Sequence, residues 1–121
     1  MGRPLIKATF DLDESGNPVL VESGKLKHYR IRLQMEGVPE DTYAVTYVLD
    51  DSYYEPIRES RKAGQFFEKL TSYGDYTVQA KIRTKAGVLN VATPLSKALS
   101  AGHEQQITPA IEAALSDIKD N

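Results

Sequence analysis

The chain has 121 residues with no cysteine, 15 basic and 17 acidic residues, and a formal net charge of −2. This length suits a single domain, and the absence of cysteine excludes disulfides, thiolate zinc sites and cysteine nucleophiles. Because the charges are balanced and spread along the sequence, we expect no basic patch of the kind that binds phosphate groups, and nucleic acid is not expected as a partner.

Two segments in the first third of the chain alternate apolar and polar residues. The apolar positions of the first segment are Ile6, Ala8, Phe10 and Leu12. Those of the second segment are Tyr29, Ile31, Leu33 and Met35. This period of two predicts two strands that each turn one face toward a core. Turn-forming residues at 14–18 and 37–41 end the two segments.

The segment TYAVTYVLD at 42–50 predicts a third strand. Its alternate residues, which we expect on one buried face, are Tyr43, Val45, Tyr47 and Leu49. Ala44 and Val48 make the opposite face partly apolar, which favours a central or covered strand. The polar stretch 51–64 predicts a long crossing loop, after which Phe66 and Phe67 return the chain to the core.

A clear alternation predicts a strand over 75–84. The apolar positions are Tyr76, Val78, Ala80 and Ile82. A turn at 85–87 and a further strand at 88–93 come next. About six short strands separated by turn signals favour an antiparallel β-sandwich over a parallel sheet.

The last quarter of the chain predicts helices. LSKALSAG at 95–102 predicts a short helix that Gly102 ends. Thr108 and Pro109 predict the start of a second helix, with Thr108 as its cap. Its apolar stripe comprises Ile111, Ala114, Leu115 and Ile118. We therefore expect a sandwich domain at 1–102 and a helical extension at 103–121 that packs on it, or that binds a protein partner.

Residues suited to catalysis are few. His28 and His103 lie far apart in the sequence without metal-ligand spacing, and the neighbours Asp50 and Asp51 would point to opposite faces of a strand. No enzyme activity, cofactor or metal is expected. The chain has no apolar run suited to a signal peptide or to a membrane span of about 20 residues, so we expect a cytoplasmic protein without a membrane partner.

Tyrosine is the distinctive residue of the middle of the chain. Tyr47 and Tyr76 lie on alternating apolar faces and are expected in the core. Tyr53, Tyr54 and Tyr73 fall in predicted loops. An aromatic ring at the entrance of a strand, as at Tyr73, can pack on the protein itself or form one wall of a binding cleft.

Two stretches resemble the two central motifs of the YEATS domain. They are VTYVLDDSYYEPIRES at 45–60 and TSYGDYTVQAKIRT at 71–84. The matching residues of the first motif are Val45, Tyr47, Leu49, Ser52, Tyr53 and Pro56. Those of the second are Tyr73, Gly74, Tyr76 and Val78. The resemblance covers roughly residues 25–95, and the C-terminal segment is more similar to bacterial relatives of this family.

The resemblance implies an immunoglobulin-like sandwich that reads acylated lysine between aromatic walls. Tyr53 would form one wall, Tyr73 would form the second wall and supply a backbone donor, and the Ser52 hydroxyl would hold the acyl carbonyl. Ser72 and Gly74 belong to the turn that carries Tyr73, and His28 lies near the site from an upstream segment.

Two departures from the family pattern affect the expected ligand. Asp50 stands where the family has histidine, and Ser72 stands where it has glycine. An acidic rim favours a positively charged ligand or weakens binding of a neutral acyl group.

We therefore expect a non-catalytic recognition module whose partner is a protein with acylated lysine or a small ligand with a flat amide or acyl group. The alternative is an immunoglobulin-like domain with a structural or protein-interaction role, for example in a bacterial sensor or defence system, that does not bind acyl-lysine.

Overall fold

The computed structural model describes residues 3–23, 26–61, 64 and 66–121. These residues form eight strands and two helices. The elements are β1 (Leu5–Phe10), β2 (Leu20–Ser23), β3 (Leu26–Glu36), β4 (Thr42–Val48), β5 (Ile57–Ser60), β6 (Glu68–Ser72), β7 (Thr77–Thr84), β8 (Gly87–Pro94), α1 (Leu95–Gly102) and α2 (Pro109–Asp120).

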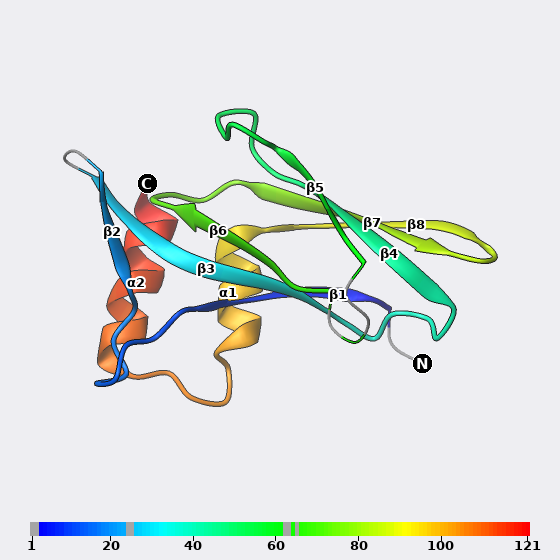
Figure 1. Ribbon diagram of the computed structural model, residues 1–121. Coiled ribbons are helices and arrows are strands. Elements are labelled where there is room, and N and C mark those ends of the chain that lie inside the picture. Colours follow the sequence, from blue (N-terminus) through cyan, green and yellow to red (C-terminus); the bar gives the residue numbers. More distant parts are fainter. Residues whose placement is uncertain (1–2, 24–25, 62–63, 65) are drawn as a thin grey trace.

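The strands form two antiparallel sheets that lie one on the other (Figure 1). In the first sheet the long strand β3 pairs with β1 and β2 along one edge and with β6 along the other. The second sheet has the order β5-β4-β7-β8. The antiparallel sandwich expected from the alternating strands, and its immunoglobulin-like form implied by the resemblance, are therefore confirmed, with short helices after the last strand.

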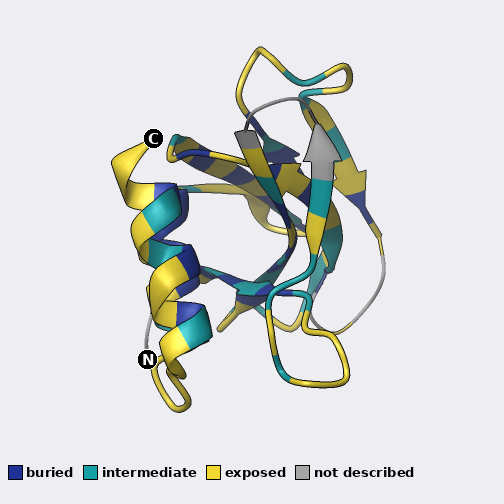
Figure 2. Cartoon of the chain, turned by 90° about the vertical axis from the view of Figure 1, so that its left-hand side faces the viewer, coloured by how far each residue is buried: buried dark blue, intermediate teal, exposed yellow. Residues whose placement is uncertain are grey.

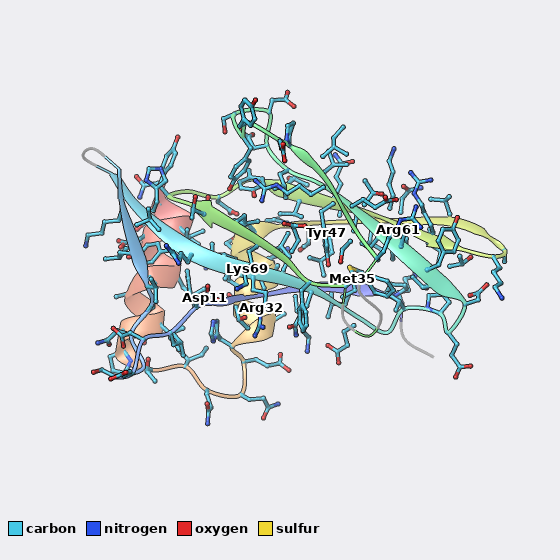
Figure 3. The ribbon with its side chains drawn as sticks, viewed as in Figure 1. Asp11, Arg32, Met35, Tyr47, Arg61 and Lys69 are labelled. Atoms are coloured by element: carbon cyan, nitrogen blue, oxygen red, sulfur yellow. The ribbon has the colours of Figure 1, made fainter. Side chains whose placement is uncertain are left out.

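Alternate residues of the central strands fill the space between the sheets. The buried positions of β3 are Tyr29, Ile31, Leu33 and Met35, and those of β7 are Val78, Ala80 and Ile82. Tyr47 of β4 lies between the sheets (Figure 3) and is fully buried. Its hydroxyl donates a hydrogen bond of 2.7 Å to the carbonyl of Phe66, so this buried polar group is satisfied.

The prediction of a crossing loop over 51–64 is wrong in part, because β5 (Ile57–Ser60) forms within it and pairs with β4. Only Ser60 of this strand is buried. A strand at the edge of a sheet, with most of its side chains exposed, has no apolar alternation to reveal it. The short strands β2 and β6 were not expected either. In β6 the buried alternate residues are Leu70 and Ser72, and because only Leu70 is apolar, no apolar alternation appears in the sequence.

Tyr43 does not share the buried face of β4, contrary to expectation. The register between β4 and β7 shifts between Thr42 and Ala44, which moves Tyr43 out of the alternation and leaves it 48% exposed. Tyr76 is only partly buried and precedes β7, so it lies at the end of the sandwich and not in its centre.

The two helices cover one side and one end of the sandwich. Helix α1 packs against β1 and begins where β8 ends. Helix α2 begins at Pro109, and the Thr108 hydroxyl accepts a hydrogen bond of 3.2 Å from the Ile111 backbone N–H, as the capping pattern predicts. Figure 2 shows the buried stripe of α2 facing the sheets and its exposed face turned away.

The apolar stripe of α2 belongs to the same core as the strands. Ile111, Ala114 and Ile118 are buried in it, and Leu115 packs against it. The hydroxyl of Tyr29 in β3 donates a hydrogen bond to the carboxylate of Asp117, which adds a polar contact between α2 and the first sheet. Among the described residues, neither helix has the length and apolar character needed to cross a bilayer.

Candidate ligand-binding site

The loop 49–56, which comes after β4, is closed by its own hydrogen bonds. The backbone N–H of Leu49 donates to the carbonyl of Pro56 at 2.7 Å. The Asp50 carboxylate accepts from the Ser52 backbone N–H at 3.1 Å and from the Ser52 hydroxyl at 2.6 Å. The Tyr53 N–H donates to the Asp50 carbonyl at 3.2 Å. These local hydrogen bonds hold the loop in one conformation and thereby fix the positions of Ser52 and Tyr53 at the end of the sandwich.

The turn 72–76 between β6 and β7 is held in a similar way. The buried Ser72 hydroxyl donates to the Gly74 carbonyl at 2.8 Å and accepts from the Gly74 N–H at 3.3 Å. The Asp75 carboxylate accepts from the backbone N–H of Ser96 at 2.8 Å and from its hydroxyl at 2.7 Å. The turn is thus tied to the first turn of α1, while Tyr73 stays 45% exposed.

Tyr53 joins the loop to the neighbouring sheet. Its hydroxyl donates to the carbonyl of Thr71 in β6 at 2.7 Å and accepts from the Tyr76 hydroxyl at 3.1 Å. The rings of Tyr53 and Tyr76 meet edge to face, with centroids 5.7 Å apart. Burial raises the pKa of both phenols above the ordinary value of 10, so both hydroxyls stay protonated at neutral pH.

Tyr73 has a different aromatic neighbour. Its ring meets that of His28 in β3 nearly at a right angle, with centroids 5.2 Å apart. The two tyrosines that the motifs single out are therefore each supported by a separate ring, Tyr76 for Tyr53 and His28 for Tyr73. Edge-to-face pairs of this kind hold rings in place and contribute about 0.5–1.5 kcal/mol beyond their buried area.

The loop, the turn and the first sheet enclose a hollow of about 500 Å³, which we call the aromatic hollow. Its lining comprises His28, Asp50, Ser52, Tyr53, Tyr54, Thr71, Ser72, Tyr73, Gly74, Asp75, Tyr76 and Asn121. All seven residues that the sequence predicted for the site line this one hollow, although they come from three separate segments of the chain. Their role in binding a ligand remains a prediction.

The aromatic hollow has an acidic rim. Asp50 and Asp75 line it, whereas no lysine or arginine of the described residues does. The hydrogen bonds from Ser52, first from its hydroxyl and then from its backbone N–H, hold the pKa of Asp50 below its usual range. A ligand therefore meets an ionised carboxylate, and the single proton of the Ser52 hydroxyl is already donated to it.

Five lining residues were not predicted, namely Tyr54, Thr71, Asp75, Tyr76 and Asn121. Tyr54 is 99% exposed at the tip of the loop, and its position beside Tyr53 was a usable signal. Asn121 gave none. A Cβ atom added at Gly74 would lie 2.7 Å from the carbonyl oxygen of Asn121, so the end of α2 passes directly over the turn. Only the folded chain brings these two residues together.

The chemistry of this hollow suits binding. Among the residues that the structure describes, no group of three or more histidine, aspartate or glutamate side chains is placed to hold a metal ion. The hollow instead offers aromatic faces, two carboxylates, hydroxyl groups and the backbone of a tight turn. Such surfaces take flat or cationic groups.

The chain is thus a two-sheet antiparallel, immunoglobulin-like sandwich with this hollow between its end loops. No family model and no curated protein matches the chain. Solved structures do match, and the fold of this chain is therefore YEATS-like.

Structures of the YEATS protein Yaf9 are among these matches. The Yaf9 YEATS domain recognizing an H3K122suc peptide has a TM-score of 0.56 and 19% sequence identity, covering 83% of this chain and 75% of its own. The yeast AF-9 homolog Yaf9 has a TM-score of 0.56 and 22% identity, covering 77% and 66%. The Yaf9 YEATS domain bound to H3K27ac has a TM-score of 0.55 and 21% identity, covering 77% and 70%.

Proposed function

We propose that this chain is a non-catalytic recognition module that binds an acylated lysine, or a similar flat amide or acyl group, in the aromatic hollow. The observation that carries the proposal is the meeting of Ser52, Tyr53 and Tyr73 around a single hollow of about 500 Å³. The Yaf9 YEATS domain, which has the same fold, recognizes an H3K122suc peptide in one structure and is bound to H3K27ac in another, and this supports the ligand class.

In this proposal the acyl group lies against Tyr53 and Tyr73, with His28 behind the second ring. The carbonyl of the amide is held by the Ser52 hydroxyl and by a backbone N–H of the turn that carries Tyr73. Because the Ser52 hydroxyl already donates to Asp50 at 2.6 Å, the ligand has to compete for this proton. Asp50 thus weakens the binding of a carbonyl and favours ligands that also carry a donor or a positive charge.

The expected affinity is low. Two aromatic contacts of about 0.5–1.5 kcal/mol each and two hydrogen bonds of similar size contribute roughly 2–6 kcal/mol before the cost of association. A micromolar complex requires about 8 kcal/mol. Residues that flank the acyl-lysine must contribute the rest, and dissociation constants above the micromolar range are expected for short peptides.

The partner is accordingly a protein with acylated lysine or a small acyl ligand, and a bacterial protein is in keeping with the C-terminal segment. The net charge of −2 disfavours nucleic acid. A cytoplasmic location, where acylated proteins are available, belongs to the same proposal.

The test is a titration of isotope-labelled protein, followed by NMR, with peptides that carry acetylated, succinylated or unmodified lysine. Shifts centred on 50–54 and 72–76, with acylated peptides only, are expected. Tyr73→Ala should abolish them with little change in thermal midpoint. Tyr43→Ala is the matched control, because Tyr43 is similarly exposed (48% against 45%) and does not line the hollow. Equal binding of unmodified peptides, or unfolding of Tyr73→Ala, would contradict the proposal.

A second candidate is a structural or protein-interaction domain without acyl-lysine binding, for example in a bacterial sensor or defence system. This candidate is supported by the hydrogen bonds that the hydroxyl groups of the hollow already form: the Ser52 hydroxyl donates to the Asp50 carboxylate, and the Ser72 hydroxyl donates to the Gly74 carbonyl. The same titration separates the two candidates, because this one predicts no shift with any peptide. It also predicts that a pull-down recovers a protein partner or an oligomer.

A further inference from the structure

A second hollow of about 420 Å³ lies on the other side of Tyr53, and we call it the basic hollow. It is lined by Asp11, Val21, Arg30, Tyr53, Arg58, Lys69, Leu70 and Thr71. Figure 3 labels two of these residues, Lys69 in β6 and Asp11, which directly follows β1. Tyr53 and Thr71 line both hollows, and the hydrogen bond of 2.7 Å between them forms the partition.

The charges on the two sides of this partition are opposite. The basic hollow has three cations, Arg30, Arg58 and Lys69, against the single carboxylate of Asp11. The aromatic hollow has the carboxylates of Asp50 and Asp75 and, among the described residues, no lysine or arginine. A ligand that crosses Tyr53 therefore passes from a negative to a positive surface.

The three cations are not equivalent. Arg58 is a structural group, because it donates to the carbonyls of Glu55 at 2.9 Å and Lys69 at 2.6 Å, and its guanidinium lies 5.5 Å from the centre of the Tyr53 ring. Glu68, 3.6 Å away, offsets its charge.

Arg30 and Lys69 lie on paired strands, β3 and β6, and both side chains are exposed. Neither forms an ion pair with any side chain that the structure describes. These two cations are free to meet an anion.

We propose that the basic hollow binds an acidic side chain that flanks the residue held in the aromatic hollow, so that the preferred partner is an acidic segment around the recognised lysine. This inference rests on the proposed function. Because an extended chain rises about 3.3 Å per residue and the hollows share a wall, the acidic residue lies within about three positions of the lysine. The contact also supplies part of the affinity that the aromatic hollow alone lacks.

The expected effect is modest and depends on salt. Exposed charges are screened within about 10 Å at 0.1 M salt. Two exposed cations should therefore favour an acidic flank by about 3- to 10-fold at low salt, and much of this preference should disappear as salt is raised.

The experiment compares three acetyl-lysine peptides that differ only in flanking residues: glutamate, glutamine or lysine. Dissociation constants are measured for the wild-type chain and for a double variant, Arg30→Gln with Lys69→Gln. The matched control is Lys81→Gln with Lys97→Gln, which removes the same charge at two exposed residues that line neither hollow. We expect the glutamate peptide to bind tightest and the double variant alone to lose this preference. Equal affinities, or a preference that survives in the double variant, would overturn the inference and leave the proposed function intact.

A tetraglutamate peptide without acyl-lysine distinguishes failure of the proposed function from failure of the acidic-flank inference. If no acetylated peptide binds, the proposed function fails, and NMR shifts of residues 30 and 69 with tetraglutamate then decide the charge assignment by themselves. Shifts that the double variant loses would support an acidic peptide site, and their absence would refute it. Tighter binding of a single-stranded oligonucleotide at the same residues would overturn the assignment in favour of phosphate.

Discussion

The Ser52 hydroxyl donates a hydrogen bond of 2.6 Å to the carboxylate of Asp50, two residues earlier in the same loop. The resemblance to YEATS domains assigns this hydroxyl to a ligand carbonyl, and the same motif has histidine in place of Asp50. In the proposed function, a ligand carbonyl therefore competes with Asp50 for this hydroxyl, because a hydroxyl has a single proton to donate.

Replacing Asp50 by alanine should strengthen binding of acetyl-lysine peptides. The Ser52 hydroxyl would then be free for the ligand carbonyl, and one net hydrogen bond corresponds to about 2- to 10-fold in affinity. Peptide titration measures the change. Asp51→Ala, which removes the neighbouring carboxylate, should have little effect, and Ser52→Ala combined with Asp50→Ala should cancel the gain. Weaker binding of the Asp50→Ala chain would show that the carboxylate itself contacts the ligand.

Tyr53→Phe should lower the free energy of unfolding by about 0.5–1.5 kcal/mol. The change removes the donor to the Thr71 carbonyl and the acceptor of the Tyr76 hydroxyl while keeping the ring. Urea unfolding at neutral pH gives the value. Tyr54→Phe is the control, because its hydroxyl belongs to a side chain that is 99% exposed, and a surface change of this kind stays within about 0.5 kcal/mol. Equal stability of the two variants would contradict a structural partition at Tyr53.

Gly102→Ala should destabilise the fold, although alanine is the better helix former. A Cβ atom at Gly102 would lie 1.9 Å from the carbonyl oxygen of Ala8 in β1, so α1 would have to move away from the first sheet. Overpacking of this kind costs about 1–3 kcal/mol, against a propensity gain of about 1 kcal/mol. The thermal midpoint measures the balance. A higher midpoint in Gly102→Ala would show that α1 does not lie this close to β1.

Stability should fall on acidification through His103. Its Nε2 accepts a hydrogen bond of 3.0 Å from the Phe10 backbone N–H, and burial lowers its pKa below the ordinary 6.5. The unfolded chain therefore binds a proton more readily than the folded chain. The contribution is complete above pH 6.5 and is lost progressively as the pH falls from 6.5 toward the lower pKa of the folded state.

Urea unfolding of the wild-type chain and of His103→Gln at pH 7.5 and pH 5 tests this. Groups other than His103 titrate in both chains, so the difference between them isolates the histidine. We expect the wild-type chain to lose more stability between the two pH values. An identical loss in both chains would exclude His103 as the source.

Alternation along the sequence by itself determined the central strands, because burial on one face of a sheet imposes a period of two on residues such as Ile31 in β3 and Val78 in β7. The start of α2 was also predictable from the sequence, since its cap Thr108 and its first turn are neighbours in sequence. The motifs around Ser52 and Tyr73 also indicated which residues lie together around one hollow.

Tertiary structure decided the rest. Strands β5 and β6 form because a central strand offers them hydrogen bonds, and their own sequences carry no apolar alternation that would reveal them. The shift of register between β4 and β7 at Thr42 and Ala44, beside which Tyr43 is exposed, is set by the pairing of the two strands. Asn121 approaches Gly74 although the two residues are distant in sequence. The same is true of the hydrogen bond from the Tyr53 hydroxyl to the Thr71 carbonyl, which separates the acidic aromatic hollow from the basic hollow. No local pattern encodes such contacts, because they depend on how the strands and helices pack.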